Sequence, residues 1–240
     1  MKSGVYTAAA GMISNLERLN AQSNNIANVN TIGFKGDIPF ETVIRSLRGL
    51  GNPGDEQPLL AGTVLKPNQG TITQSDRKLD LAIEGHGFFV FQAENGEKLL
   101  SRNGSLIINA NDEITSSTGQ PVLDIFDKPV RVFGNNLAIS SSGDVSIEDN
   151  YLTRLKVVAA PWENLEKVGN QFFRITRGAG AVIENPTLAV GALERANVEI
   201  IDEMAQMIYT QRSFEVQQRA IETILMQILR STVNDLPRAI

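Results

Sequence analysis

Hydrophobic side chains recur at alternating steps of four and three residues near both ends of the chain. This spacing is typical of helices that pack side by side at small crossing angles. The N-terminal pattern contains Val5, Ala9, Met12, Leu16, Leu19, Ser23 and Ile26. The C-terminal pattern contains Ile200, Met204, Met207, Gln211, Phe214, Gln218, Ile221, Leu225 and Ile228. The two patterns predict one long helix at each end of the chain.

The middle of the chain shows short apolar runs separated by turn residues instead. Asn95-Gly96 separates Phe88–Gln92 from Lys98–Ser101, and this dipeptide favours the tight turn of a β-hairpin. Ser142-Gly143 separates two further strand candidates, and Asn103-Gly104 predicts one more turn of the same kind. Short strands at this spacing predict an antiparallel sandwich or barrel.

We therefore expect an α+β fold. In it, the long N- and C-terminal helices form a coiled-coil-like module, and the centre is a mainly antiparallel β domain. The expected helical module comprises residues 1–35 and 191–240, and the expected β-rich domain residues 76–190. Residues 36–75 hold a cluster of Gly and Pro and are expected to form a linker or extended region.

Composition excludes several classes of function. The 240 residues carry a net charge of −5, which argues against non-specific nucleic-acid binding, since that requires a basic face. No apolar run approaches the roughly 20 residues that cross a bilayer, so no membrane insertion is expected. Polar residues from Ser14 to Arg18 interrupt the apolar stretch that a cleaved signal peptide needs. The absence of cysteine excludes disulfides and thiolate chemistry.

The terminal patterns leave two arrangements open, because spacing reveals that a helix has neighbours without counting them. The helices either form a private antiparallel hairpin or contribute to an assembly of many chains. Ile201 and Ile208 widen the C-terminal apolar stripe, and Gln211 and Gln218 supply polar positions that fix register; both features favour an assembly. The residues expected at the assembly interface are Met12, Leu16, Leu19, Ile26, Met207, Phe214, Ile221 and Leu225.

The sequence leaves two other classes of function as alternatives. His86 is the only histidine and stands near Asp80 and Glu84, as a general base oriented by a carboxylate would in a secreted hydrolase. No nucleophile motif accompanies it, so a solvated turn residue is the better interpretation. A soluble helical-hairpin adaptor is the other alternative. We expect no catalytic, cofactor-binding or metal-binding residues.

Four blocks of sequence give the chain its resemblance to a known family. The segment from Ser23 to Lys35 resembles the N-terminal signature of bacterial flagellar basal-body rod and hook proteins, and Ser3–Met12 before it is similar too. The remaining blocks are Leu79–Phe89, Ser101–Ser105 and Gly191–Val198, the last followed by Met204, Ile208 and Gln211-Arg212. The signature residues are Ser23, Asn24, Asn25, Asn28, Gly33, Phe34 and Lys35.

The resemblance implies a structural subunit of the axial rod, with copies of itself and neighbouring rod proteins as partners and no cofactor. It implies terminal helices that build an inner tube, a β domain in the outer layer, and export without a cleaved signal through the flagellar type III apparatus. Length favours a rod subunit over the longer hook subunit. Within the rod, we expect the proximal-rod protein next to the distal rod, with the distal-rod subunit as the alternative. The turn at Asn109–Glu113 departs from the family in lacking a glycine, and Ala160–Asn164 replaces an Asn-Pro-containing stretch.

Overall fold

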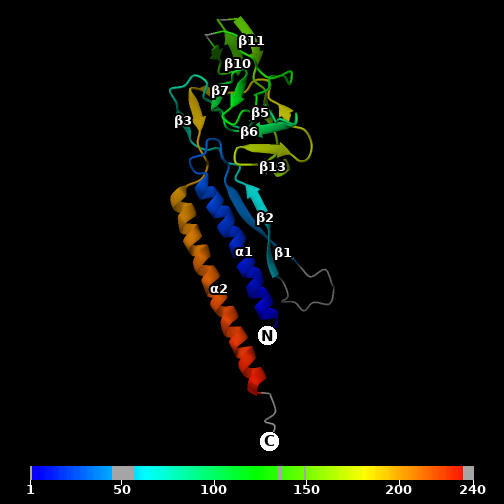
Figure 1. Ribbon diagram of the computed structural model, residues 1–240, viewed down its shortest axis with the longest axis vertical. Coiled ribbons are helices and arrows are strands. Elements are labelled where there is room, and N and C mark those ends of the chain that lie inside the picture. Colours follow the sequence, from blue (N-terminus) through cyan, green and yellow to red (C-terminus); the bar gives the residue numbers. More distant parts are fainter. Residues whose placement is uncertain (1, 45–56, 135–136, 149, 235–240) are drawn as a thin grey trace. The chain divides into compact units, whose positions relative to one another are not determined.

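The computed structural model describes residues 2–44, 57–134, 137–148 and 150–234. These residues form two compact units (Figure 1). The first, here called the helical unit, combines both chain ends with residues 37–64. The second, the β unit, comprises residues 28–36 and 65–198. Each unit is described separately below.

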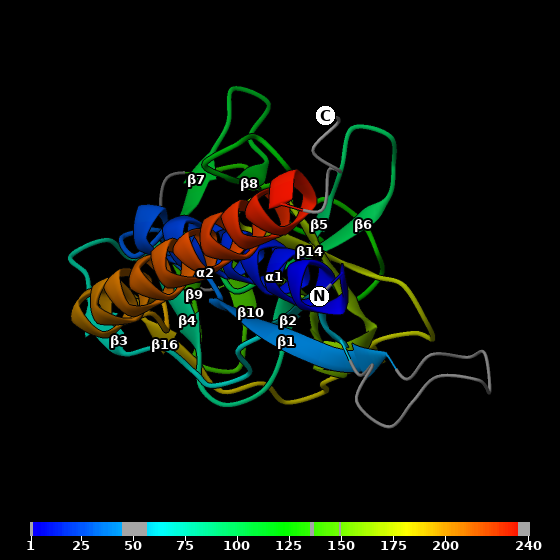
Figure 2. The same cartoon turned by 90° about the horizontal axis from the view of Figure 1, so that it is seen from below.

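The helical unit contains two long helices and two strands. Helix α1 spans Lys2–Ala27, α2 spans Ile200–Asn234, and the paired strands are β1 (Asp37–Ile44) and β2 (Gln57–Leu65). The helices lie side by side and antiparallel, since Asn15 contacts Gln217 while Asn25 contacts Glu203 (Figures 1 and 2). Both terminal helices predicted from the apolar spacing are therefore present.

The β unit is built on a six-stranded sheet with the order β13-β14-β6-β5-β12-β15. A three-stranded sheet (β11-β10-β9) and the two-stranded pairs β16-β4, β17-β3 and β7-β8 complete it. All of the strand pairings in this unit are antiparallel, so the predicted antiparallel β domain is found. The strands are β3 (Ile72–Gln74), β4 (Leu81–Ile83), β5 (Phe88–Gln92), β6 (Lys98–Ser101), β7 (Leu106–Ile108), β8 (Ile114–Ser116), β9 (Leu137–Ile139), β10 (Asp144–Ile147), β11 (Asn150–Arg154), β12 (Val157–Ala159), β13 (Leu165–Val168), β14 (Phe172–Ile175), β15 (Ala181–Val182), β16 (Leu188–Val190) and β17 (Ala192–Glu194).

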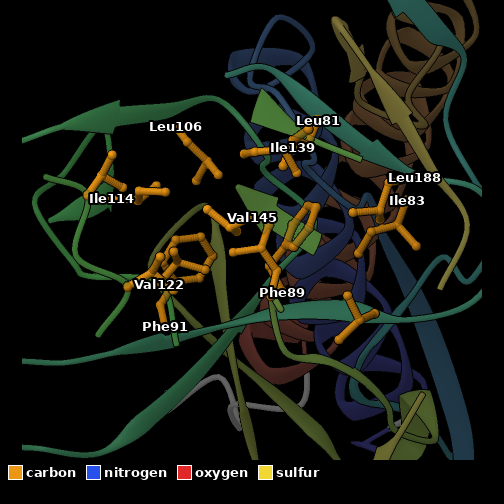
Figure 3. Close-up of a cluster of buried hydrophobic side chains, with 14 of the residues drawn as sticks. Leu81, Ile83, Phe89, Phe91, Leu106, Ile114, Val122, Ile139, Val145 and Leu188 are labelled. Carbon is orange, nitrogen blue, oxygen red and sulfur yellow. The ribbon is translucent and has the colours of Figure 1, made fainter. Parts of the chain in front are cut away.

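Strand β5 lies at the centre of the β unit and is buried on both faces. Phe89 and Phe91 belong to the larger of two apolar clusters, which Figure 3 shows, while Phe88 and Val90 belong to the smaller one. Alternate residues of a strand point to opposite faces, so a strand covered on both sides needs an unbroken apolar run. The sequence from Phe88 to Phe91 meets that need.

Three turn predictions have different outcomes. The turn at Asn95-Gly96 joins β5 to β6, with Gly96 at a φ of 81°, and Ser142-Gly143 joins β9 to β10, as expected. The hairpin predicted at Asn103-Gly104 is wrong, because β7 pairs with β8 instead of β6. Gly104 is required there for another reason: a Cβ on it would overlap the carbonyl oxygen of Leu81.

The turn that lacks the family's glycine still adopts the conformation that glycine favours. Asp112, in the Asn109–Glu113 turn, has a φ of 59°. The Oδ1 atom of Asn109 accepts hydrogen bonds from the backbone N–H groups of Asn111 and Glu113 at 2.8 and 2.9 Å. Asn and Asp tolerate the left-handed region and support turns in this way, so they substitute for glycine here.

The expected fold class is wrong in one respect. The terminal helices were expected to form a coiled-coil-like module with an apolar seam. In the structure, the residues that α1 and α2 bury against one another within the helical unit are largely polar or small, including Ser14, Asn15, Gln22 and Thr210. The described residues thus contain two long helices in polar contact, together with a mainly antiparallel β unit.

Candidate assembly surface

The contact between α1 and α2 depends on side-chain hydrogen bonds. Asn15 Nδ2 donates to Ser213 Oγ at 3.2 Å and to Gln217 Oε1 at 3.0 Å. Further along, Gln22 Nε2 donates to Thr210 Oγ1 at 3.3 Å, and Asn25 Nδ2 donates to Glu203 Oε1 at 3.2 Å. Buried amides and hydroxyls must be paired in this way, because an unsatisfied one costs about 1–3 kcal/mol.

Small residues bring the two helices close together. Ala10 and Ala21 are buried, and a Cβ added to Gly11 would lie 2.8 Å from the side-chain nitrogen of Gln217. Close approach of this kind places the short side chains of Asn15 and Ser213 within hydrogen-bonding distance. The intrachain contact therefore has geometric specificity but buries few large apolar groups.

The predicted seams overlap only in part with the residues that make this contact. On α1, Gly11, Asn15 and Asn25 face α2, whereas the predicted seam contains Met12, Leu16 and Ile26. One residue is a rotation of about 100° around a helix. On α2 the predicted pattern divides in two. Met204, Gln211 and Leu225 are exposed, whereas Met207, Phe214 and Ile221 are half-buried on the same side of the helix as Thr210 and Gln217. The apolar seam of α1 is thus turned away from the centre of the intrachain contact, whereas part of the α2 seam lies on the contact face.

None of the eight predicted interface residues is fully buried. Leu16 and Leu225 are each 46% exposed. The other six are half-buried at the margins of the helix pair: Met12, Leu19, Ile26, Met207, Phe214 and Ile221. The structure therefore leaves these side chains accessible within the helical unit, and their role in assembly stays a prediction.

The outer face of α2 carries more exposed apolar surface than the predicted seam. Ile201, Met204 and Ile208 form one group with exposures of 78%, 48% and 55%, here called the proximal patch. Leu225, Met226 and Leu229 form a second group, the terminal patch, in which Met226 is 62% exposed. The stretch between the two is mainly polar. It exposes Gln211, Glu215, Gln218, Arg219 and Glu222, together with Tyr209 and Val216. Single exposed apolar residues are ordinary, but grouped ones mark interaction surfaces.

The signature residues are divided between the two units. In the helical unit Ser23 is exposed, while Asn24 and Asn25 fix the start of β1. Asn24 Nδ2 donates to Asp37 Oδ2 at 3.1 Å, and Asn25 exchanges two hydrogen bonds with the backbone of Asp37 at 2.8 and 2.9 Å. These amides therefore hold β1 beside the last turn of α1.

The other four signature residues, Asn28, Gly33, Phe34 and Lys35, are buried in the β unit. Gly33 has a φ of 69°, its N–H donates to the carbonyl of Glu194 at 2.8 Å, and a Cβ would lie 2.5 Å from the backbone nitrogen of Asn103. The ammonium of Lys167 lies 4.3 Å from the centre of the Phe34 ring, a cation–π distance. Only glycine fits the Gly33 position.

Lys35 belongs to a buried ion cluster that the sequence analysis missed. Its ammonium lies 2.6 Å from Glu194 Oε1, and Arg102 Nε lies 3.0 Å from Glu194 Oε2. All three side chains are at most 3% exposed. Burial lowers the pKa of Lys35 and of Arg102, and the adjacent Glu194 carboxylate opposes both shifts. The one sequence signal that could have found the cluster is that Lys35, Arg102 and Glu194 each lie in a different block that resembles the rod and hook family.

The hydrolase alternative finds no support in the geometry. His86 is exposed in the turn between β4 and β5. Asp80 is buried, and its carboxylate accepts hydrogen bonds from the hydroxyls of Ser75 and Ser105 at 2.5 and 3.3 Å. That carboxylate therefore organises two neighbouring turns. Within the described ranges, no group of three or more His, Asp or Glu side chains is arranged to hold a metal ion.

Neither long helix has the length and apolar character of a membrane span within the residues that the structure describes. In α2, charged and amide side chains interrupt the apolar groups throughout. The exposed apolar groups of the helical unit are thus narrow patches.

Comparison with known proteins places three family models along the chain. A flagellar basal body rod protein model matches residues 5–35, a flagellar hook protein FlgE/F/G D1 domain model residues 82–151, and a flagellar basal body rod FlgEFG C-terminal model residues 189–224. The N- and C-terminal models cover most of α1 and the first two-thirds of α2. The D1 model covers strands β5 to β10.

Curated relatives match nearly the full chain. The flagellar basal-body rod protein FlgG of Borreliella burgdorferi is 32% identical over 93% of this chain and 95% of its own length. FlgG of Bacillus subtilis is 28% identical over 98% and 99%, and FlgF of Mesorhizobium japonicum is 27% identical over 90% of each. The family is structural rather than enzymatic. The chain therefore belongs to the family of flagellar basal-body rod proteins and is a structural subunit of the rod.

Proposed function

We propose that this subunit builds the rod by packing the exposed apolar faces of its two long helices against copies of itself and neighbouring rod proteins. The observation that carries the proposal is the polar contact between α1 and α2. That contact leaves Leu16 on α1 and the side chains of the proximal and terminal patches of α2 between 46% and 78% exposed, so these side chains call for an apolar partner. An assembly of many chains supplies one.

The energetics favour several neighbours over one. Burying an exposed Ile, Leu or Met side chain fully is worth about 1.5–3 kcal/mol, and these side chains are already partly covered, so each contributes about 1 kcal/mol. Association costs an estimated 4–15 kcal/mol in lost freedom of motion. One patch is therefore marginal, whereas two patches about 25 Å apart along α2 can engage two neighbours at once. Heterologous contacts that do not close produce a filament.

The predicted interface residues retain a role in this proposal. Met12, Leu16 and Leu19 on α1, with Ile26, lie beside the intrachain contact and are accessible from one side. On α2 the equivalent residues are Met207, Phe214, Ile221 and Leu225. We infer that they line the same intermolecular contacts as the two patches.

The remaining expectations also belong to this proposal. The helices of the terminal segments, residues 1–35 and 191–240, form the inner tube, and the β unit that contains the β-rich residues 76–190 forms the outer layer, so the assembly transmits torque along the rod axis. The subunit travels through the flagellar type III export apparatus without cleavage of a signal peptide. Because relatives include both FlgG and FlgF proteins, the proximal position next to the distal rod stays our prediction and the distal rod the alternative. Labelling this chain in isolated basal bodies decides between them.

A matched pair of variants tests the assembly surface. Leu225→Asp places a charge in the terminal patch, while Gln227→Asp introduces the same residue two positions along, at a site that is already polar and exposed. We expect Leu225→Asp to abolish incorporation into basal bodies and swimming, and Gln227→Asp to preserve both. Circular dichroism of the purified variants verifies that each retains its helices. Normal incorporation of Leu225→Asp would refute the proposed surface.

A further inference from the structure

The chain passes between its two units four times, next to residues 28, 36, 65 and 198. On the β-unit side, three of these crossings are joined by hydrogen bonds to one another. The N–H of Gly36 donates to Asn197 Oδ1 at 2.8 Å, and Asn197 Nδ2 donates to the carbonyl of Lys66 at 2.9 Å. The N–H of Lys66 donates in turn to the carbonyl of Gly36 at 2.8 Å. These bonds form a closed ring.

The buried ion cluster ties the same segments to the body of the β unit. Lys35 Nζ donates to the carbonyl of Asn68 at 2.8 Å as well as to Glu194 Oε1. Glu194 Oε1 also accepts from the N–H of Gly70 at 3.0 Å. Arg102 donates to the carbonyls of Gly87 and Gly85 at 2.8 and 2.7 Å. The cluster thus joins residues as far apart in sequence as Lys35 and Glu194, which are separated by 159 positions.

These segments lie outside the two apolar cores, and they bury Phe34, Ala192 and Val198 beside the polar network. Among the described residues, neither apolar cluster of the β unit includes any member of 28–36, 66–75 or 191–198. They are attached by the ion cluster, the Asn197 ring and the short pairing of β3 with β17. Further hydrogen bonds run from the N–H groups of Gly191 and Ala192 to the carbonyl of Asp80, at 2.8 and 3.3 Å. Removing one partner of a buried ion pair leaves an uncompensated charge, which is strongly destabilising. Such a network is therefore expected to be present or absent as a whole.

We propose that residues 28–36, 66–75 and 191–198, with Arg102, form one cooperative latch that fixes all four chain crossings together and opens as a unit while the β-sheet cores remain folded. This device completes the β unit only when segments from both chain ends are in place. It also makes any force carried along one crossing act on the other three. The latch is independent of the apolar faces through which we propose that the rod assembles.

Hydrogen exchange of the full-length chain, resolved by peptide, tests the proposal. In Glu194→Gln we expect the amides of all three latch segments to exchange faster by a factor of about 100 or more, to a similar extent. Strands β5 and β10 are expected to retain their protection. Glu97→Gln is the matched control, because Glu97 pairs with Arg174 at 3.1 Å in an exposed ion pair. We expect it to change none of these segments.

Asn197→Ala is the second variant and keeps all three buried charges. It removes three hydrogen bonds at the crossings, so we expect the same segments to exchange together, faster by about tenfold or more. If Glu194→Gln does not fold, hydrogen exchange of Asn197→Ala tests the proposal instead. The proposal is overturned if β5 and β10 lose protection equally, if only the mutated segment responds, or if exchange does not change.

Discussion

Gly33→Ala should destabilise the β unit well beyond the cost of its backbone conformation. Gly33 has a φ of 69°, where an alanine costs about 1–2 kcal/mol. Its added Cβ would also lie 2.5 Å from the backbone nitrogen of Asn103 and 2.6 Å from the carbonyl carbon of Arg102. These two atoms belong to one buried peptide group, and moving that group away from the new Cβ costs about 1–3 kcal/mol more. We expect a total loss of about 2–5 kcal/mol.

Gly169→Ala provides the matched control, because Gly169 has the same φ of 69° and open space around the added Cβ. Its expected cost is only about 1 kcal/mol, since a more restricted unfolded chain offsets part of the strain. Denaturant unfolding followed by the fluorescence of Trp162, the single tryptophan, measures both in the β unit. Equal losses in the two variants would refute the close approach and the packing of the signature segment.

Two further predictions concern other parts of the chain. Asn15→Ala removes the hydrogen bonds to Ser213 and Gln217, so the free energy of unfolding of the helical unit should fall by about 1–3 kcal/mol in urea, measured by circular dichroism. Asn20→Ala, at an exposed position of α1, should be neutral or slightly stabilising. Equal effects of the two substitutions would contradict the polar contact. Hydrogen bonds from Lys156, and secondarily from Lys98, hold the pKa of Asp127 below its ordinary value of 3.8. The stability that these hydrogen bonds contribute is present above pH 3.8 and disappears as the pH falls through the lowered pKa of Asp127. Asp127→Asn should therefore reduce the loss of stability below about pH 4, by a small amount because the ion pairs are partly exposed. An unchanged dependence of stability on pH would contradict this prediction.

Local sequence signals predicted the elements well where one segment decides the outcome. The apolar run from Phe88 to Phe91 and the Asn95-Gly96 turn are sufficient to specify the β5–β6 hairpin. The same dipeptide at Asn103-Gly104 has another role, since Gly104 is demanded by the nearby backbone of Leu81. Sequence cannot distinguish a glycine needed for its φ from one needed for close approach, because the second depends on a distant strand.

Local sequence signals could not predict the buried ion cluster either, because it also depends on contacts between distant parts of the chain. Lys35, Arg102 and Glu194 are far apart in the chain, and each has the composition of an ordinary surface residue. Their common feature is that each lies within a block that resembles the rod and hook family. In the structure, three of these blocks meet in the β unit, where Lys35 and Arg102 both form ion pairs with Glu194.

The one-residue offset on α1 explains why periodicity found both helices but only part of their contact. A repeat of four and three residues identifies the face where apolar side chains gather, and in an isolated domain that face is the intrachain contact. Here the adjacent face makes that contact through Asn15, Gln22 and Thr210. Polar pairs of this kind contribute about 1 kcal/mol each and specify register, so the helices align while Leu16 and the two patches of α2 stay exposed. A subunit that must offer this surface to its neighbours gains from that division, because the intrachain contact then leaves the proximal and terminal patches accessible.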